Sequence, residues 1–197
     1  MQNTTLVFAT GNAHKLEEVR SILNQSWLRL KSLKELDFHD DIEETGHTLA
    51  ANATIKSQAI YKTVGGNIFS EDTGLEVIAL GMQPGVITAR YAGPQRSADD
   101  NMAKLLSELA GVSDRTARFR TVISLIWDGK EYLFEGIVNG QIALEKRGGQ
   151  GFGYDPIFIP YGYEQSFAEL DKAEKNSISH RYRAVSRMKS WLEKLER

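Results

Sequence analysis

Two pairs of acidic residues have types and positions that could do chemistry together. Glu43-Glu44 precede a predicted helix, and Glu71-Asp72 end an apolar run. Mg²⁺ binds a few carboxylates and completes its coordination with phosphate oxygens and water, so two separated acidic pairs would suit a Mg²⁺-nucleotide site. A carboxylate held near such a metal could also take a proton from an attacking water. Glu43-Glu44 could instead only compensate the dipole of the following helix, whereas Glu71-Asp72 fit the rim of a site better than a core.

A second candidate site is the turn of residues 10–15, Thr-Gly-Asn-Ala-His-Lys, which lies between an apolar run and a helical pattern. Free N–H groups at the start of a helix and the positive end of its dipole bind phosphate, and Lys15 would add a mobile charge. The turn lacks the spacing of a P-loop and of GxGxxG, so neither of those nucleotide motifs applies. The alternative is a capped strand-to-helix turn with a surface lysine.

A third candidate is the glycine-rich segment of residues 148–151, which leads into Phe152-Gly153-Tyr154-Asp155-Pro156. Glycines let a backbone approach a ligand closely, and an aromatic face can stack on a base. Pro156 and a predicted strand follow, instead of the helix that a dinucleotide-binding loop requires. A structural loop with core aromatic residues is the alternative.

A fourth candidate is the segment of residues 175–181 at the start of the last predicted helix. Ser177 or Ser179 could cap that helix, and His180 and Arg181 would then project near its N-terminus, where anions bind. The alternative for a His-Arg pair on a helix is a solvated face.

The elements that must position these residues alternate between strand and helix. Asn12 is predicted to be the N-cap of the first helix, and Asn52 and Lys56 lie four residues apart on one stripe of a later helix. Asp128-Gly129 is predicted to turn a hairpin. Periodicity predicts strands at residues 4–9, 28–33, 67–70, 75–80, 117–127, 132–144 and 157–159, helices at 48–64 and 98–109, and a C-terminal helix with an apolar stripe of Ile178, Tyr182, Val185, Met188, Leu192 and Leu195. This mixture predicts an α/β or α+β domain with a mixed sheet.

Composition narrows the class of protein. The chain has 197 residues and a net charge of −2, which argues against a protein that mainly grips a nucleic-acid backbone. That balance conceals six acids and no Lys or Arg in residues 35–46, against eight Lys and Arg in residues 171–197. Because the sequence has no cysteine, disulfides, thiolate zinc sites and thiol nucleophiles are excluded. The first apolar run, residues 6–9, is too short for a signal peptide or a membrane span, so we expect a cytoplasmic protein.

Six motifs in a fixed order are more specific than any one of them. Together they resemble the inosine/xanthosine triphosphate pyrophosphatase family, the enzymes that remove non-standard purine nucleotides, over about residues 5–195. The motifs are Thr10-Gly11-Asn12-x-x-Lys15, Glu44-Thr45-Gly46 with Asn52-Ala53-x-x-Lys56, Glu71-Asp72-Thr73-Gly74-Leu75, Pro84-Gly85 with Ala89-Arg90-Tyr91-Ala92-Gly93, Phe152-Gly153-Tyr154-Asp155-Pro156 and Ser179-His180-Arg181.

The resemblance implies a fold and an activity. The fold would be an elongated α/β structure with a long central mixed sheet flanked by helices, forming one domain over residues 1–197 with two lobes around a central cleft. The activity would be Mg²⁺-dependent hydrolysis of the α–β phosphoanhydride of ITP, dITP and XTP, which yields the nucleoside monophosphate and pyrophosphate. A cytoplasmic homodimer is the implied form.

The resemblance also implies roles for individual residues. Asp72 would be the proton acceptor and a metal ligand, with Glu44 as the second ligand and Glu71 as the alternative to Glu44. Lys56 and Thr73 would contact phosphate or sugar. The triphosphate would be held by Thr10, Gly11, Asn12, Ala13, His14 and Lys15, and the base pocket would consist of Phe152, Gly153, Tyr154, Asp155, Lys175, His180 and Arg181.

Other functions remain as alternatives at this point. The nearest is the related pyrophosphatase group that acts on pyrimidine and modified nucleotides, which the Phe-Gly-Tyr-Asp and Ser-His-Arg motifs disfavour. A non-catalytic nucleotide-binding regulator belongs to a different class and would release no pyrophosphate. A nucleic-acid-binding module is the weakest alternative, because the sequence has no basic cluster interleaved with aromatic residues.

Overall fold

A computed structural model describes residues 4–38 and 42–195 of the chain. Residues 39–41 of the acidic stretch therefore lie outside the described residues. The chain divides into two compact units, which we describe separately. Unit 1 comprises residues 1–72, 121–136 and 181–197, and unit 2 comprises residues 73–120 and 137–180.

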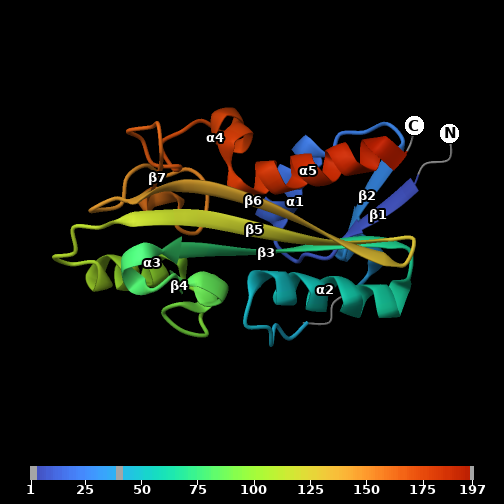
Figure 1. Ribbon diagram of the computed structural model, residues 1–197, viewed down its shortest axis with the longest axis horizontal. Coiled ribbons are helices and arrows are strands. Elements are labelled where there is room, and N and C mark those ends of the chain that lie inside the picture. The colour runs from blue at the N-terminus through green and yellow to red at the C-terminus, as the bar shows by residue number, and fades with distance from the viewer. Residues whose placement is uncertain (1–3, 39–41, 196–197) are drawn as a thin grey trace. The chain divides into compact units, whose positions relative to one another are not determined.

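Unit 1 has helices on both faces of its strands (Figure 1). The strands β3, β5 and β6 contribute one part of their length to this unit and continue along the chain into the other. The elements of unit 1 are β1 (Thr4–Phe8), α1 (Ala13–Ile22), β2 (Leu28–Ser32), the short 3₁₀ helix η1 (Lys34–Leu36), α2 (Leu49–Val64), the first part of β3 (Asn67–Val77), the second part of β5 (Thr116–Trp127), the first part of β6 (Lys130–Ile142) and nearly all of α5 (His180–Leu195).

Strand β1 lies between β2 and β3 and is parallel to both. Its side chains alternate between two cores, as expected for a strand covered on both faces. Phe8 packs with α1 and α5 in one core, and Val7 packs with α2 in the other. In β3, Phe69 joins the first core and Ile68 joins the second. Successive residues of β3 therefore face different helices.

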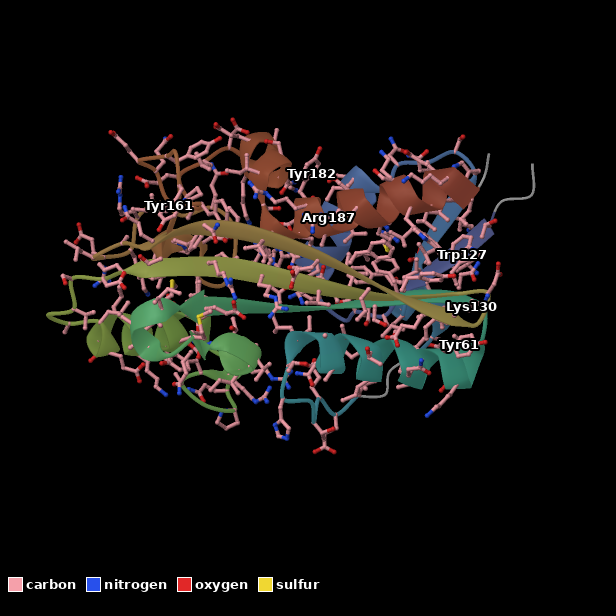
Figure 2. The ribbon with its side chains drawn as sticks, in the orientation of Figure 1. Tyr61, Trp127, Lys130, Tyr161, Tyr182 and Arg187 are labelled. Carbon is pink, nitrogen blue, oxygen red and sulfur yellow. The ribbon has the colours of Figure 1, made fainter. Side chains whose placement is uncertain are left out.

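Helix α2 begins and ends where the sequence predicts. The Thr48 hydroxyl accepts a hydrogen bond from the N–H of Ala51 at 3.0 Å, which caps the first turn. At the other end, Gly65 takes a positive φ of 65°, a conformation that residues with a side chain adopt only at a cost. The β5–β6 hairpin turns near this end of α2, where Tyr61, Trp127 and Lys130 gather (Figure 2).

Unit 2 has one apolar core. Leu75, Phe119 and Phe158 from its strands pack there against Leu105 of α3, and the loop residue Phe167 closes the cluster. Its elements are the remaining parts of β3, β5 and β6, with η2 (Ile78–Leu80), β4 (Gln83–Pro84), η3 (Gly85–Arg90), α3 (Ala98–Glu108), η4 (Asp155–Ile157), β7 (Phe158–Pro160) and α4 (Lys172–Ile178). Strands β4 and β7 pair antiparallel with β3 and β6, so the sheet is mixed.

Strand β3 corrects one sequence-based expectation. Residues 71–74 were expected to separate two strands, but β3 runs without interruption from Asn67 to Val77, and residues 78–80 form η2. Glu71 and Asp72 are buried within the strand. A strand tolerates consecutive buried acids only when both are paired, and both have cationic partners in unit 1.

The C-terminal region corrects a second expectation, because it contains two helices. Ser179 takes an extended conformation between α4 and α5, and the N-cap of α4 is Asp171. Ser177 therefore lies inside α4 and Ile178 is its last residue. Of the predicted stripe, the residues that enter a core from α5 are Val185, Met188 and Leu192, whereas Tyr182 and Leu195 are 37% and 51% exposed.

In the part of the chain that the structure describes, no helix is both long enough and apolar enough to cross a membrane.

The packing of α5 yields a stability prediction. Met188 is fully buried, so Met188→Ala should lower the free energy of unfolding by about 2–5 kcal/mol through lost apolar contact and the cavity left behind. Leu195→Ala, at an exposed position of the same helix, is the matched control and should change it by less than about 0.5 kcal/mol. Urea denaturation measures both, and equal losses would contradict this account of the stripe.

Candidate active site

The turn between β1 and α1 is held by its own side chains. Asn12 is the N-cap of α1, and its Oδ1 accepts hydrogen bonds from the N–H groups of His14 at 3.0 Å and Lys15 at 3.2 Å. The Thr10 hydroxyl accepts from the N–H of Asn12 at 3.2 Å. The predicted cap is therefore confirmed. Gly11 and Ala13 complete an exposed turn at the positive end of the helix dipole.

A buried charge network lies between α1, β3 and α5. Arg181 is 1% exposed, and its Nε donates to both carboxylate oxygens of Glu71 at 2.9 Å. Its Nη2 donates to Glu71 at 2.8 Å, and its Nη1 donates to Glu18. Lys15 Nζ lies 3.1 Å from Glu71 Oε1. The alternative of a solvated face for His180-Arg181 is therefore wrong.

The electrostatics of this network keep Glu71 and Arg181 ionised. Burial alone would raise the pKa of Glu71, but the charges of Arg181 and Lys15 outweigh it and lower the pKa to about 2. Burial also opposes the charge of Arg181, yet Glu71 and Glu18 raise the pKa of its guanidinium. For Lys15, burial lowers the pKa, and the attraction of Glu71 offsets this only in part. Lys15 is thus a cation whose charge needs an anionic neighbour.

A second cluster lies on the α2 side of β3. Lys56 Nζ contacts Glu44 Oε1 at 3.1 Å and Asp72 Oδ1 at 3.3 Å, so that one ammonium joins both carboxylates. Asn52 Nδ2 donates to the other oxygen of Asp72 at 3.3 Å. Burial raises the pKa of Asp72, the positive charge of Lys56 partly counters this, and the nearby Glu44 raises the pKa further. A carboxylate whose pKa is raised is a better proton acceptor than an ordinary aspartate.

The donor set of this cluster fits a divalent cation that also binds phosphate. Within residues 4–38 and 42–195, no group of three or more His, Asp and Glu side chains is arranged to hold a metal ion alone. Glu44 and Asp72 nevertheless converge on one positive charge, the ammonium of Lys56. Two carboxylates completed by phosphate oxygens and water are the ligand set that Mg²⁺ commonly uses in nucleotide sites.

Unit 2 contains the remaining candidate residues, and several of them are in contact. Lys175 Nζ pairs with Asp155 at 2.7 Å and lies 4.9 Å from the centre of the Phe152 ring. Asp155 also accepts from the N–H of Phe152 at 2.8 Å, and the Tyr154 hydroxyl donates to the carbonyl of Thr88 at 3.0 Å.

Two glycines of this loop serve its own packing. Gly151 takes a φ of +79°, and a Cβ at this position would collide with the Asp155 carboxylate. Gly148 takes a φ of +76° and lies against the backbone of Ala168. Gly153, with a φ of +65°, has open space around its Cβ position. Within unit 2, His180 stacks on Phe119 with ring centroids 4.6 Å apart.

The structure thus groups the predicted residues within each unit. Unit 1 brings Lys15 together with Arg181, and Glu44 with Lys56 and Asp72, on the two faces of β3. Unit 2 brings Phe152, Tyr154, Asp155 and Lys175 together, and it also contains Gly153, Thr73 and His180.

Sequence reasoning missed two residues of these clusters. Glu18 was not a candidate, although it lies four residues before Ile22 on the buried stripe of α1, where a carboxylate needs a partner. Asn52 was noted in a motif but given no role, and its fully buried amide links Gly46 to Asp72. In both cases the signal was a polar residue at a buried helical position.

Curated relatives match almost the whole chain. It is 47% identical over 189 residues to the dITP/XTP pyrophosphatase of Christiangramia forsetii, which covers 96% of this chain and 99% of that protein. It is 49% identical over 188 residues to the dITP/XTP pyrophosphatase of Porphyromonas gingivalis, with 95% and 96% coverage. These relatives confirm the resemblance that the six motifs predicted.

Solved structures confirm the predicted fold class. The Ham1 protein of Staphylococcus aureus superposes with a TM-score of 0.90 at 38% identity, covering 98% of this chain and 100% of that one. A HAM1 protein from Coxiella burnetii gives 0.91 at 37% identity, with 97% and 99% coverage. The sequence profile of the Ham1 family matches residues 6–191. On motifs, fold and near full-length identity alike, this chain is a member of the Ham1 family.

Proposed function

We propose that this protein hydrolyses the non-standard purine nucleoside triphosphates ITP, dITP and XTP to the monophosphate and pyrophosphate, and so removes them from the nucleotide pool. The observation that carries the proposal is the buried Asp72 carboxylate, held by Asn52 and Lys56 beside Glu44. This cluster occurs in a chain that is 47% identical over nearly its full length to a dITP/XTP pyrophosphatase.

The phosphates are assigned to the cationic and N–H groups of unit 1 and to Thr73. The turn of residues 10–15 offers N–H groups at the start of α1, and Lys15 stands beside them. Lys56 adds a second charge next to the two carboxylates. Phosphoanhydride hydrolysis depends mainly on neutralised phosphate oxygens and a positioned water, which suits such a set.

Asp72 is assigned two tasks. It would orient the attacking water and take its proton, since burial raises its pKa towards the working range of a general base. With Glu44 it would also hold Mg²⁺, which when bound neutralises charge on the phosphate oxygens. Both oxygens of Glu71 accept from Arg181, which supports Glu44 over Glu71 as the second ligand.

Base recognition is assigned to Phe152, Gly153, Tyr154, Asp155, Lys175, His180 and Arg181. The ammonium of Lys175 beside the Phe152 ring combines a hydrogen-bond donor with a stacking surface. A donor aimed at the 6-keto oxygen of hypoxanthine or xanthine would reject adenine, whose 6-amino group also donates. An unsatisfied buried donor costs about 1–3 kcal/mol, which gives roughly tenfold to hundredfold discrimination per contact.

The proposal includes the oligomeric state and the cellular compartment of the enzyme. We assign it to the cytoplasm, where the nucleoside triphosphates that feed nucleic-acid synthesis are found, and we assign it a homodimeric state. Light scattering after size-exclusion chromatography measures the oligomeric state. A mass of about twice the 22.1 kDa of one chain is expected.

The first activity prediction concerns substrate and metal. With Mg²⁺, pyrophosphate release from dITP or XTP should exceed that from ATP at least about tenfold, because a donor aimed at the 6-keto oxygen rejects the 6-amino group of adenine. Release from GTP should also be slower, and since guanine shares the 6-keto group this requires a separate contact at the 2-position. Chelation of the metal with EDTA should abolish release, and added Mg²⁺ should restore it. Equal turnover of all four nucleotides would contradict the selectivity, and nucleotide binding without any pyrophosphate would indicate a regulator.

The second activity prediction concerns Asp72. Asp72→Asn keeps the shape of the side chain but removes the proton acceptor, and it should lower kcat for dITP by at least about 10²-fold. Asp99→Asn is the matched control, and kcat should not change. Asp99 is an exposed acid of α3 in unit 2, where it forms an ion pair with Lys146. Activity retained in Asp72→Asn would move the proton acceptor to another carboxylate.

A further inference from the structure

The side chain of Asn52 connects two parts of the candidate site. It is fully buried in the first turns of α2, and its Nδ2 donates to Asp72 Oδ2 at 3.3 Å. Its Oδ1 accepts from the N–H of Gly46 at 2.8 Å. Gly46 lies two residues after Glu44, so one amide contacts both the catalytic strand and the loop that carries the other carboxylate.

The contact between Gly46 and Asn52 is too close for a side chain at position 46. A Cβ there would lie 2.5 Å from Asn52 Oδ1, 2.8 Å from Ala51 Cβ and 2.9 Å from Asn52 N. The neighbouring helix backbone cannot yield as a flexible side chain would. The absence of a side chain at Gly46 therefore lets the loop approach the amide.

Helix α2 is attached to the sheet by two hydrogen bonds, so the Asn52 amide has a fixed position. The Ser70 hydroxyl of β3 donates to the carbonyl of Ala53, and the Ser57 hydroxyl is hydrogen-bonded to Ser124 of β5 at 2.6 Å. These bonds set the position of α2 along the strands. Asn52 and, one turn later, Lys56 thereby address the two oxygens of Asp72 separately.

Lys56 and Asn52 both contact Asp72 but differ in charge, and this difference affects how each would respond to a bound cation. Lys56 brings a positive charge, which competes with a metal ion for the same carboxylates. Asn52 contacts Asp72 through a neutral amide, so it adds no charge that a bound cation would have to displace. A neutral donor that orients a ligating carboxylate is a recurrent outer partner in metal sites.

We propose that Asn52 is a positioning residue that fixes the Asp72 carboxylate relative to the loop bearing Glu44, and thereby sets the affinity of this pair for a divalent cation. The inference deepens the proposed function and rests on it for the identity of the reaction. Its prediction about cation binding stands apart from turnover.

The experiment measures binding of Mn²⁺ alone to the full-length protein, from the EPR signal of free Mn²⁺, and the Mg²⁺ concentration that gives half-maximal pyrophosphate release from dITP. Asn52→Ala should weaken Mn²⁺ binding and raise that Mg²⁺ concentration at least about tenfold. Ser32→Ala is the matched control, since Ser32 is a buried residue of β2 whose hydroxyl donates to Glu35 at 2.7 Å, outside the Asp72 cluster, and the substitution should lower thermal stability without moving either cation value.

Gly46→Ala provides a second variant that leaves Asn52 and Asp72 in place, so the inference remains testable if Asn52→Ala fails to fold. It should also weaken Mn²⁺ binding, because the added Cβ displaces the loop from the amide. Unchanged Mn²⁺ binding in the folded variants, or an equal loss in Ser32→Ala, would overturn the inference. If wild-type protein binds Mn²⁺ and Asn52→Ala weakens that binding, but no pyrophosphate is released, the proposed function alone is overturned.

Discussion

The constraint on which the candidate site depends is the burial of two consecutive carboxylates, Glu71 and Asp72, in one strand. An isolated buried carboxylate is far too costly to stay ionised, so each needs partners of its own. Because side chains alternate along a strand, the two acids face opposite layers of unit 1. Glu71 meets Lys15 and Arg181, and Asp72 meets Asn52 and Lys56. Polar partners on both faces of the sheet are therefore required to bury both acids.

The two acids end in different electrostatic states because their partners differ. Glu71 has a pKa near 2, since a guanidinium and an ammonium both attract its charge. Asp72 has a raised pKa, because burial outweighs the attraction of Lys56 and Glu44 adds repulsion. Adjacent carboxylates are thus divided into a permanent anion that holds cations in place and a group suited to exchange a proton. The division follows from which helix each residue faces.

The sequence predicted the local elements well where a local signal exists. Asn12 is the N-cap of α1 as predicted, and α2 begins after Thr48 and ends before Gly65, because helix ends depend on a few neighbouring residues. The strand through Glu71 and Asp72 was missed, because polar residues indicate a loop unless their distant partners are known. The break at Ser179 was missed for a similar reason, since the apolar spacing continued across it.

The contacts within the candidate site were also difficult to predict, because they join residues that are distant in the chain. Family motifs predicted the candidate residues, and several of these are in contact in the clusters around Asp72 and Asp155. The partners of Arg181 could not be predicted, since Glu71 and Glu18 lie 110 and 163 positions away in the chain. Buried polar residues at helical positions, such as Glu18 and Asn52, are the one sequence signal that would have revealed the missing contacts.

The alternation of β3 makes strand register a condition for the charge pattern of the candidate site as well as for stability. A slip of one residue would turn Asp72 towards Arg181 and Glu71 towards Asn52, so that the electrostatic states of the two acids would be exchanged. Parallel pairing of Phe8 with Phe69, whose rings stack 4.4 Å apart, opposes this slip two residues before the first acid. An apolar contact two residues before the acids thus helps to fix which helix each carboxylate faces.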